Sequence, residues 1–137
     1  VRDFNGIKFY NDSFSSASGA TIAAINSFSE PLVLLLGGYD KGILFDDIAA
    51  VIARSSNIKR VIVFGAVKHK IQKSFDEVGF SNYVIEQSND FNQVFISAKN
   101  AASPGDVVLL SPGTSSFDMF KNFYERGEKF KQLVMEL

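Results

Sequence analysis

Short apolar runs alternate with stretches of helical periodicity along this chain. Continuous apolar runs that end at a polar or glycine-containing loop are typical of strands buried on both faces of a sheet. Such runs lie at 31–36, 59–64 and 106–110, with a shorter strand expected at 82–85. Helical spacing occurs at 20–28, 45–54, 67–78, 90–102 and 117–137. This alternation predicts an α/β fold, an open and mostly parallel Rossmann-like three-layer sheet with helices on both faces.

The N-terminal segment predicts an antiparallel hairpin. Asn5-Gly6 lies between two short runs that contain apolar residues. This dipeptide favours a type I′ turn, because both central residues of that turn need a positive φ. We expect the second strand of the hairpin at about 7–11. No linker or repeat interrupts the chain, so residues 1–137 are expected to form one domain.

Parallel α/β sheets bind their ligands beyond the carboxyl ends of their strands. Three loops take this position here, at 11–19, 37–42 and 111–116, and they are rich in Gly, Ser and Asp or Lys. We call these three loops the rim and expect the functional residues there.

The loop at 37–42 allows two interpretations. Its glycines permit close backbone approach to a ligand, and Lys41 offers a cation for a carboxylate or phosphate. It has neither the Walker A nor the GxGxxG spacing, so it is not a standard nucleotide loop. The alternative is an ordinary strand-to-helix turn with a solvated lysine.

The loops at 111–116 and 11–19 also allow two interpretations each. Ser115 or Ser116 could cap a helix that begins at 117, with Asp118 in its first turn, or that helix end could receive an anionic ligand. The Asn11-Asp-Ser13 loop could present a carboxylate to a ribose or an amine, or it could form an Asx turn that ends a strand.

Composition excludes several classes of function. The net charge of −1 argues against binding to nucleic acid. No apolar run approaches the roughly 20 residues of a membrane span, and no leader pattern is present, so no membrane association is expected. The lack of cysteine excludes disulfides and thiolate zinc sites and fits a reducing compartment, so we expect a cytoplasmic protein.

The remaining charged residues predict solvated surfaces. His69 lies between two lysines on an expected helix and is the single histidine, which leaves little for a metal centre. The last expected helix carries alternating charges, typical of a salt-bridged outer face: Lys121, Glu125, Arg126, Glu128, Lys129 and Lys131.

Three motifs, in order, resemble the C-terminal domain of the Mur ligases. The family has an Asn-Asp-Ser-Lys-Ala-Thr type of motif, where this chain has Phe9-Tyr-Asn-Asp-Ser-Phe-Ser-Ser16. The family's Gly-Gly-x-(Asp/Gly)-Lys loop is present as Gly37-Gly-Tyr-Asp-Lys41. Its Leu-Ser-Pro run is matched almost residue for residue by Leu110-Ser-Pro-Gly-Thr-Ser-Ser-Phe-Asp-Met-Phe-Lys-Asn-Phe-Tyr-Glu-Arg-Gly127. The resemblance spans essentially the whole chain and is nearest to the D-glutamate-adding branch.

The resemblance implies an activity. Ligases of this branch form an amide bond by phosphorylating a UDP-sugar carboxylate with ATP, after which the amine of D-glutamate attacks the acyl phosphate. The chain would then be the C-terminal domain of a longer enzyme of peptidoglycan synthesis. The resemblance further implies that ATP and Mg²⁺ are held mainly by a central domain outside this chain, that the UDP-sugar is bound by other domains, and that this domain alone is inactive.

The resemblance also implies roles for individual residues. Lys41 would pair with a carboxylate of D-glutamate or a similar acidic amino acid, and Ser116 with the backbone of Phe117 would bind its other end near a helix N-terminus. Phe123 would pack on the bound ligand, and Ser16 stands at the position of the family's threonine. Asn11 and Asp12 would approach the nucleotide.

One departure from the family pattern leaves alternatives open. Phe14 stands where the family usually has lysine, and the Asn-Pro that follows the threonine is replaced by Ala17-Ser18. A homologue that adds another amino acid, or a non-catalytic α/β binding module, would also fit these residues. A receiver-like nucleotide-binding domain fits poorly, because the acidic cluster that such domains use for Mg²⁺ is missing.

Overall fold

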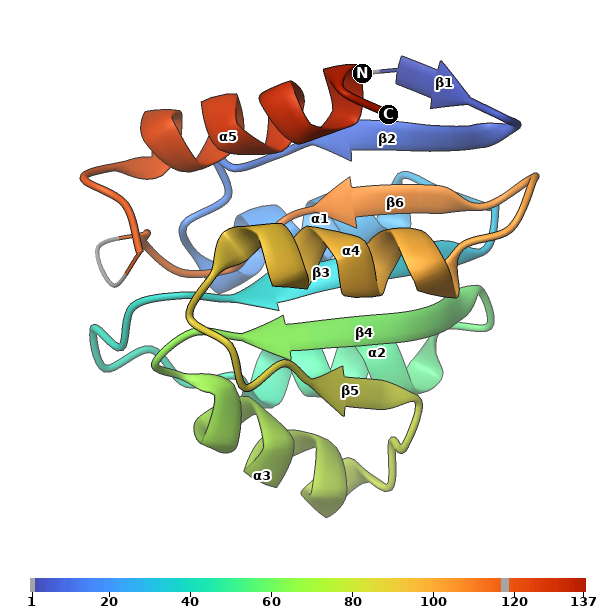
Figure 1. The fold of residues 1–137 in the computed structure, drawn as a ribbon. Coiled ribbons are helices and arrows are strands. Elements are labelled where there is room, and N and C mark those ends of the chain that lie inside the picture. Colours follow the sequence, from blue (N-terminus) through green and yellow to red (C-terminus); the bar gives the residue numbers. More distant parts are fainter. Residues whose placement is uncertain (1, 117–118) are drawn as a thin grey trace.

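The computed structural model describes residues 2–116 and 119–137 (Figure 1). Within these residues the chain forms one six-stranded sheet in the order β1-β2-β6-β3-β4-β5. The strands are β1 (Arg2–Phe4), β2 (Ile7–Asn11), β3 (Leu32–Gly37), β4 (Ile58–Phe64), β5 (Tyr83–Ile85) and β6 (Val107–Leu110). The helices are α1 (Ser18–Asn26), α2 (Asp46–Arg54), α3 (Lys68–Val78), α4 (Phe91–Ala101) and α5 (Phe123–Met135).

The N-terminal hairpin is confirmed. β1 and β2 pair antiparallel with Phe4 opposite Ile7, and the other neighbouring strands pair in parallel. Asn5 and Gly6 have φ of 54° and 83°, as a type I′ turn requires. The α/β prediction is therefore correct, with the hairpin's first strand forming one edge of the sheet.

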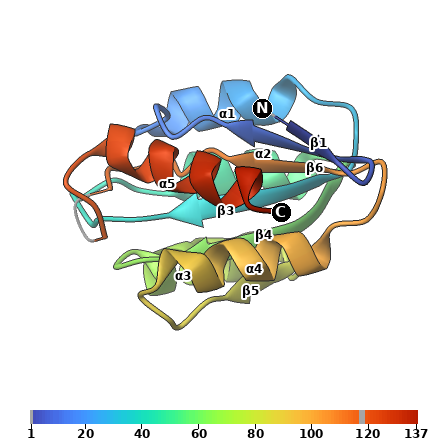
Figure 2. The ribbon, with the colours of Figure 1, turned by 45° about the horizontal axis from the view of Figure 1, so that its top comes forward.

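Helices cover both faces of the sheet, which buries the central strands completely. Residues of α1, α2 and α3 pack in one hydrophobic cluster, and residues of α4 and α5 pack in another. Figure 2 shows α4 and α5 together on one side of the strands and α1 on the other. None of the helices in the described residues is long and apolar enough to cross a membrane.

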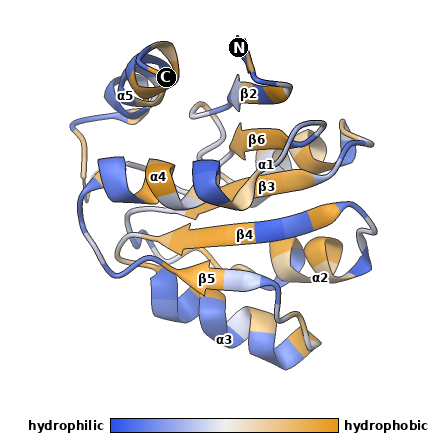
Figure 3. Cartoon of the chain, turned by 45° about the vertical axis from the view of Figure 1, so that its right-hand side comes forward, coloured by the Kyte–Doolittle hydropathy of each residue, from blue (hydrophilic) through white to orange (hydrophobic). Residues whose placement is uncertain are grey.

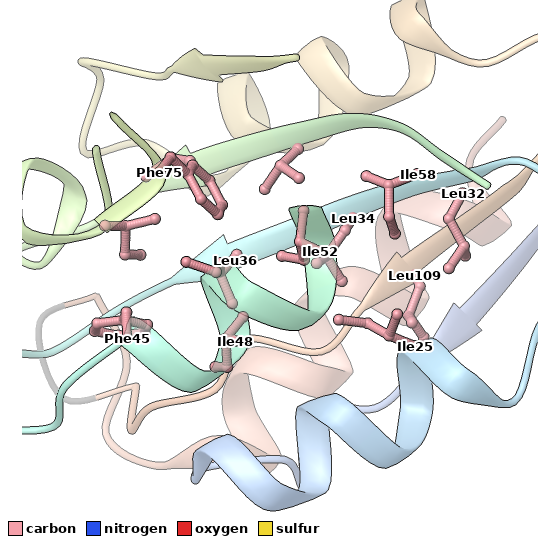
Figure 4. Packing of buried hydrophobic residues seen from close by; sticks show 14 of the residues in the cluster. Ile25, Leu32, Leu34, Leu36, Phe45, Ile48, Ile52, Ile58, Phe75 and Leu109 are labelled. Carbon is pink, nitrogen blue, oxygen red and sulfur yellow. The ribbon is translucent and has the colours of Figure 1, made fainter. Parts of the chain in front are cut away.

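β3 contributes side chains to both clusters. Leu34 and Leu36 point toward α2, where Figure 4 shows them beside Ile48 and Ile52, whereas Leu35 faces the other cluster. Each fully buried leucine stabilises the fold by about 1.5–3 kcal/mol. Figure 3 shows the central strands mostly hydrophobic and α3 largely hydrophilic.

The chain path creates a topological switch point at the carboxyl ends of the strands. β2 and β3 are followed by α1 and α2 on one face, whereas β6, which lies between them, is followed by α5 on the opposite face. The chain therefore leaves β6 toward the face opposite to the one taken after each of its two neighbours. Such switch points are where open α/β sheets bind ligands.

The last helix begins later than the sequence pattern predicts. α5 starts at Phe123, because Asn122 accepts a hydrogen bond from the Glu125 N–H at 2.8 Å and caps the helix. The prediction that Ser115 or Ser116 caps a helix starting at 117 is therefore wrong. Asp118, expected in the first turn, lies outside the described residues.

Candidate functional site

The structure brings the three rim loops together. The Gly37 N–H donates to Pro112 O at 3.1 Å, and the Tyr39 N–H donates to Ser115 O at 2.9 Å. The Gly113 N–H donates to Ser15 O at 3.0 Å. These bonds hold the loops as one surface, as their shared position in the sheet predicts.

The glycine pair after β3 is explained by close packing within the chain. Gly37 and Gly38 have φ of 147° and 145°, which side chains rarely adopt. A Cβ at Gly38 would lie 2.4 Å from Ser115 O, and one at Gly37 would lie 1.9 Å from Phe64 O. The glycines let this loop fit between its neighbours, and this explains them without a ligand.

Lys41 projects from a loop that is anchored beside it. Asp40 forms a salt bridge with Lys70 at 2.8 Å and accepts the Gly42 N–H at 3.0 Å. The hydrogen bond from Lys70, and then that from Gly42, holds the pKa of the Asp40 carboxyl below its usual value. Lys41 itself is exposed and forms no salt bridge with the carboxylates of the described residues. Its ammonium is therefore available to an anionic ligand.

Asn11 and Asp12 are engaged in holding the rim together. The Ser13 N–H donates to Asn11 Oδ1 at 3.1 Å, which is the Asx turn that the sequence left open, and the Asn11 amide donates to Gly127 O at 3.2 Å. The Asp12 carboxylate accepts hydrogen bonds from the hydroxyls of Ser111, at 2.8 Å, and Ser15. Both side chains therefore make hydrogen bonds within the chain, at the positions where the resemblance implies contact with the nucleotide.

Hydroxyl groups on the loop after β6 divide into two kinds. Ser111 donates to Asp12 and lies 3.3 Å from the Thr21 hydroxyl, and Thr114 donates to Tyr39 O at 2.8 Å. By contrast, the Oγ atoms of Ser115 and Ser116 are buried and have no hydrogen-bond partner in the described part of the chain.

Ser116 itself is only 1% exposed. Because α5 begins at Phe123, Ser116 does not lie at a helix N-terminus, so that part of its expected setting is wrong. Phe117, the other residue assigned to this end of the amino acid, lies outside the described residues. Ser16 is half-buried on the loop that follows β2.

An aromatic pair borders a pocket beside the rim. Phe14 is 77% exposed, and its ring packs edge-to-face on Phe123 at 4.8 Å between centroids. Phe123 is itself 39% exposed. The pocket has a volume of about 280 Å³ and is lined by Asn11, Ser13, Phe14, Phe123, Tyr124, Gly127, Glu128 and Lys131.

Arg126 is buried, although the charge pattern of this segment predicts a solvated helix face. It is only 1% exposed and is among the largest fully buried side chains, so that prediction is wrong for this residue. Its Nη2 donates to Ser13 O at 2.7 Å, its Nε to Ser13 Oγ at 2.9 Å, and its Nη1 to Thr114 O at 3.0 Å. Its spacing offered a signal, because position 126 lies one turn before Phe130 on the buried face of α5.

The described residues hold no group of three or more His, Cys, Asp or Glu side chains that could bind a metal ion. His69 is exposed, as predicted. Among the described residues, the rim offers the exposed ammonium of Lys41, buried hydroxyls, the carboxylates of Asp12 and Asp40 and the exposed ring of Phe14.

Comparison with known proteins assigns the family. A family model described as "Mur ligase, glutamate ligase domain" matches residues 1–114. The chain is 41% identical over 140 residues to a UDP-N-acetylmuramoylalanine--D-glutamate ligase of Clostridium kluyveri, covering 100% of this chain and 30% of that protein. It is 44% identical over 139 residues to the ligase of the same name from Acetivibrio thermocellus, covering 98% of this chain and 29% of that protein. The chain thus spans less than a third of the length of these relatives.

A solved structure supports the fold. A domain assigned to a UDP-N-acetylmuramate:L-alanyl-gamma-D-glutamyl-medo-diaminopimelate ligase of Haemophilus ducreyi matches with a TM-score of 0.59 and 13% identity. The match covers 97% of this chain and 89% of that one. At this identity the likeness concerns the fold alone, whereas the family model and the relatives at about 40% identity settle membership. The chain belongs to the Mur ligase family and carries its glutamate ligase domain.

Proposed function

We propose that residues 1–137 are the C-terminal, amino-acid-binding domain of a longer ATP-dependent ligase. The reaction would add D-glutamate to UDP-N-acetylmuramoyl-L-alanine during peptidoglycan synthesis in the cytoplasm. The relatives that carry this ligase name match over the full chain, which supports the assignment. The UDP-sugar would be bound by parts of the enzyme outside this chain.

The observation that carries the proposal is the unpaired hydroxyl of Ser116. A buried polar group without a partner costs about 1–3 kcal/mol, so one is retained where a ligand or another domain completes it. The segment of Ser116 is joined to the loop of Lys41, since the Tyr39 N–H donates to Ser115 O. A buried hydroxyl without a partner and an exposed cation on joined loops suit an amino acid that carries two carboxylates.

The chemistry asked of this domain is positioning and charge neutralisation. An amine held on a dianionic molecule must approach an anionic acyl phosphate, and a lysine on one carboxylate reduces that repulsion. In the proposed arrangement Lys41 binds one carboxylate, while Ser116 and the backbone of Phe117 bind the other end. Phe123 covers the hydrocarbon part of the ligand, and Ser16 supplies a further hydroxyl.

ATP, with Mg²⁺, would supply the phosphoryl group that activates the carboxylate. The residues here fit only a peripheral contact with the nucleotide, because the Asp12 carboxylate is already engaged by two serine hydroxyls and the Asn11 amide by the backbone. Phe14 offers no positive charge. This supports the proposal that the nucleotide and its metal are held mainly by a central domain of the whole enzyme.

A second candidate is a ligase homologue that adds another amino acid, or a domain that binds without catalysis. The exposed aromatic ring of Phe14 beside Phe123 favours these, because it makes this wall of the pocket apolar where the family usually has lysine. The exposed Lys41 and the unpaired Ser116 favour an acidic ligand.

The test is a ligase assay on the full-length protein with ATP and UDP-N-acetylmuramoyl-L-alanine, offering D-glutamate, L-glutamate and neutral amino acids separately. Phosphate release that depends on D-glutamate supports the proposal. Turnover with another amino acid would support the reaction class and assign a different amino-acid specificity. A folded full-length protein that turns over none of them contradicts the ligase assignment. Turnover by residues 1–137 alone would contradict the proposal that the other domains are needed for activity.

A further inference from the structure

We propose that Arg126 is the positioning residue of the rim, which sets the Ser13 and Thr114–Ser116 segments relative to α5. The inference rests on the proposed function for its kinetic consequence, but its structural part can be tested without activity. The alternating charges of this helix do not predict this role. It follows from three contacts made by one buried guanidinium.

First, the guanidinium of Arg126 connects two loops of the rim. Arg126 donates to two main-chain carbonyls, Ser13 O and Thr114 O, which lie on different loops, and to the hydroxyl of Ser13. Ser13 is 4% exposed and Thr114 is fully buried, so water cannot replace these donors without opening the structure. A planar guanidinium can reach both loops at once, whereas a lysine ammonium acts from a single point.

The second step is the docking of α5 at the same place. The Ser13 hydroxyl that accepts from Arg126 also donates to Phe123 O at 2.6 Å, and the Asn11 amide donates to Gly127 O. A Cβ at Gly127 would lie 3.0 Å from Asn11 Nδ2, so the helix and the loop are in close contact. Positions 123, 126 and 127 have the spacing of one helix face, and each bonds to Asn11 or Ser13 at the carboxyl end of β2.

The third step connects this joint to the proposed ligand groups. Thr114, held by Arg126, donates its hydroxyl to Tyr39 O, and Ser115 O accepts the Tyr39 N–H. Through these bonds the segment that carries Ser116 and the loop that carries Lys41 are held together. A shift of about 1 Å in a binding group can cost on the order of 100-fold in rate, so the geometry at this joint matters to the reaction.

The experiment compares three variants of the full-length ligase. Arg126→Met removes the donors and keeps much of the volume, and Arg126→Lys keeps the charge without the planar fork. Phe75→Leu, in α3 on the face of the sheet opposite to α5, is the control for loss of stability alone, because Phe75 is fully buried and its ring packs on those of Phe80 and Tyr83. Kinetics are measured at a temperature where circular dichroism shows each variant folded.

We expect Arg126→Met to raise the KM for the incoming amino acid by at least about tenfold, with Arg126→Lys between it and the wild type. Phe75→Leu should leave this KM within about twofold of the wild-type value, even where its melting temperature falls as far as that of Arg126→Met. A folded Arg126→Met with an unchanged KM would overturn the proposal, and so would an equal rise in the Phe75→Leu variant. If Arg126→Met does not fold, Arg126→Lys decides by the same criteria.

Hydrogen–deuterium exchange keeps the outcome separate from the proposed activity. Arg126→Met should speed amide exchange by at least about tenfold in both rim segments, 13–16 and 111–116, while Phe75→Leu leaves their protection at its wild-type level relative to the sheet. An inactive wild-type enzyme would remove the proposed function, yet this exchange pattern would still support Arg126 as the residue that positions the rim. Unchanged exchange in both segments would reject that role whether or not the enzyme is active.

Discussion

Replacing Ser116 with alanine should leave the domain at least as stable as the wild type, although the residue is almost completely buried. Its hydroxyl has no hydrogen-bond partner in the described residues, so the folded state carries the cost of an unsatisfied polar group. That cost is about 1–3 kcal/mol, and the substitution removes it while keeping the Cβ. We expect the free energy of unfolding to stay the same or to rise by about 1 kcal/mol.

Ser111→Ala is the matched control on the same loop. Ser111 is equally buried, but its hydroxyl donates to the Asp12 carboxylate at 2.8 Å. A hydrogen bond to a charged group contributes about 1.5–3 kcal/mol, so this variant should lose about that much. The two serine-to-alanine variants should therefore differ by about 3 kcal/mol, which corresponds to roughly 10 °C in melting temperature for a domain of this size.

The assay is urea and thermal unfolding of residues 1–137, followed by circular dichroism. Stability that is retained in Ser116→Ala and lost in Ser111→Ala would mark the first hydroxyl as kept for binding and the second as kept for the fold. If Ser116→Ala is destabilised as much as Ser111→Ala, the hydroxyl has an internal partner. A ligand is then not needed to complete it.

Three further results are expected. Gly38→Ala should lower the free energy of unfolding by about 3–5 kcal/mol, because its Cβ would lie 2.4 Å from Ser115 O at a φ that favours glycine. Gly42→Ala, with φ of 83° and open space around it, should lower it by only about 1–2 kcal/mol. Equal losses in urea unfolding would contradict this. Phe130→Ala should lower the free energy of unfolding by about 3–5 kcal/mol, since Phe130 is 1% exposed and packs α5 onto the sheet. A loss below about 1 kcal/mol in the same assay would show that α5 does not pack on the sheet in this way. The pKa of Asp40 is lowered, so its bond to Lys70 stabilises the fold at pH values above the ordinary carboxyl pKa of 3.8, and this stabilisation is lost as the pH falls through the lower folded pKa. Carboxyl titration by NMR should show the pKa of Asp40 returning toward 3.8 in Lys70→Met. An unchanged pKa would reject Lys70 as the main cause of the shift.

The sheet was predictable because its signals are local. The apolar run of β3 fills both faces of the sheet, so every position must be hydrophobic, and the hairpin turn requires two residues that accept positive φ. The position of the rim followed from chain direction alone, since the carboxyl ends of parallel strands meet at one edge. Those features need no knowledge of distant contacts.

The joint between α5 and the rim was not predictable in the same way. The start of α5 depends on Asn122, whose capping signal competes with earlier serines that fit the same pattern equally well. Arg126 is buried only because Ser13 and Thr114 supply acceptors from loops far away in the sequence. The resemblance of the Arg-Gly motif was visible, but charge alternation along the helix indicated an exposed face.

The most direct test of the account is the KM for D-glutamate of the full-length enzyme carrying Lys41→Ala. Lys99→Ala serves as the control, because Lys99 is an exposed lysine in the last turn of α4, at the end of the helix away from the rim. If the rim binds the incoming amino acid through an available ammonium, the KM should rise at least about tenfold in Lys41→Ala and stay within about twofold in Lys99→Ala, since a charge-assisted hydrogen bond contributes about 1.5–3 kcal/mol. An unchanged KM in Lys41→Ala would contradict the assignment of the rim as the amino-acid site.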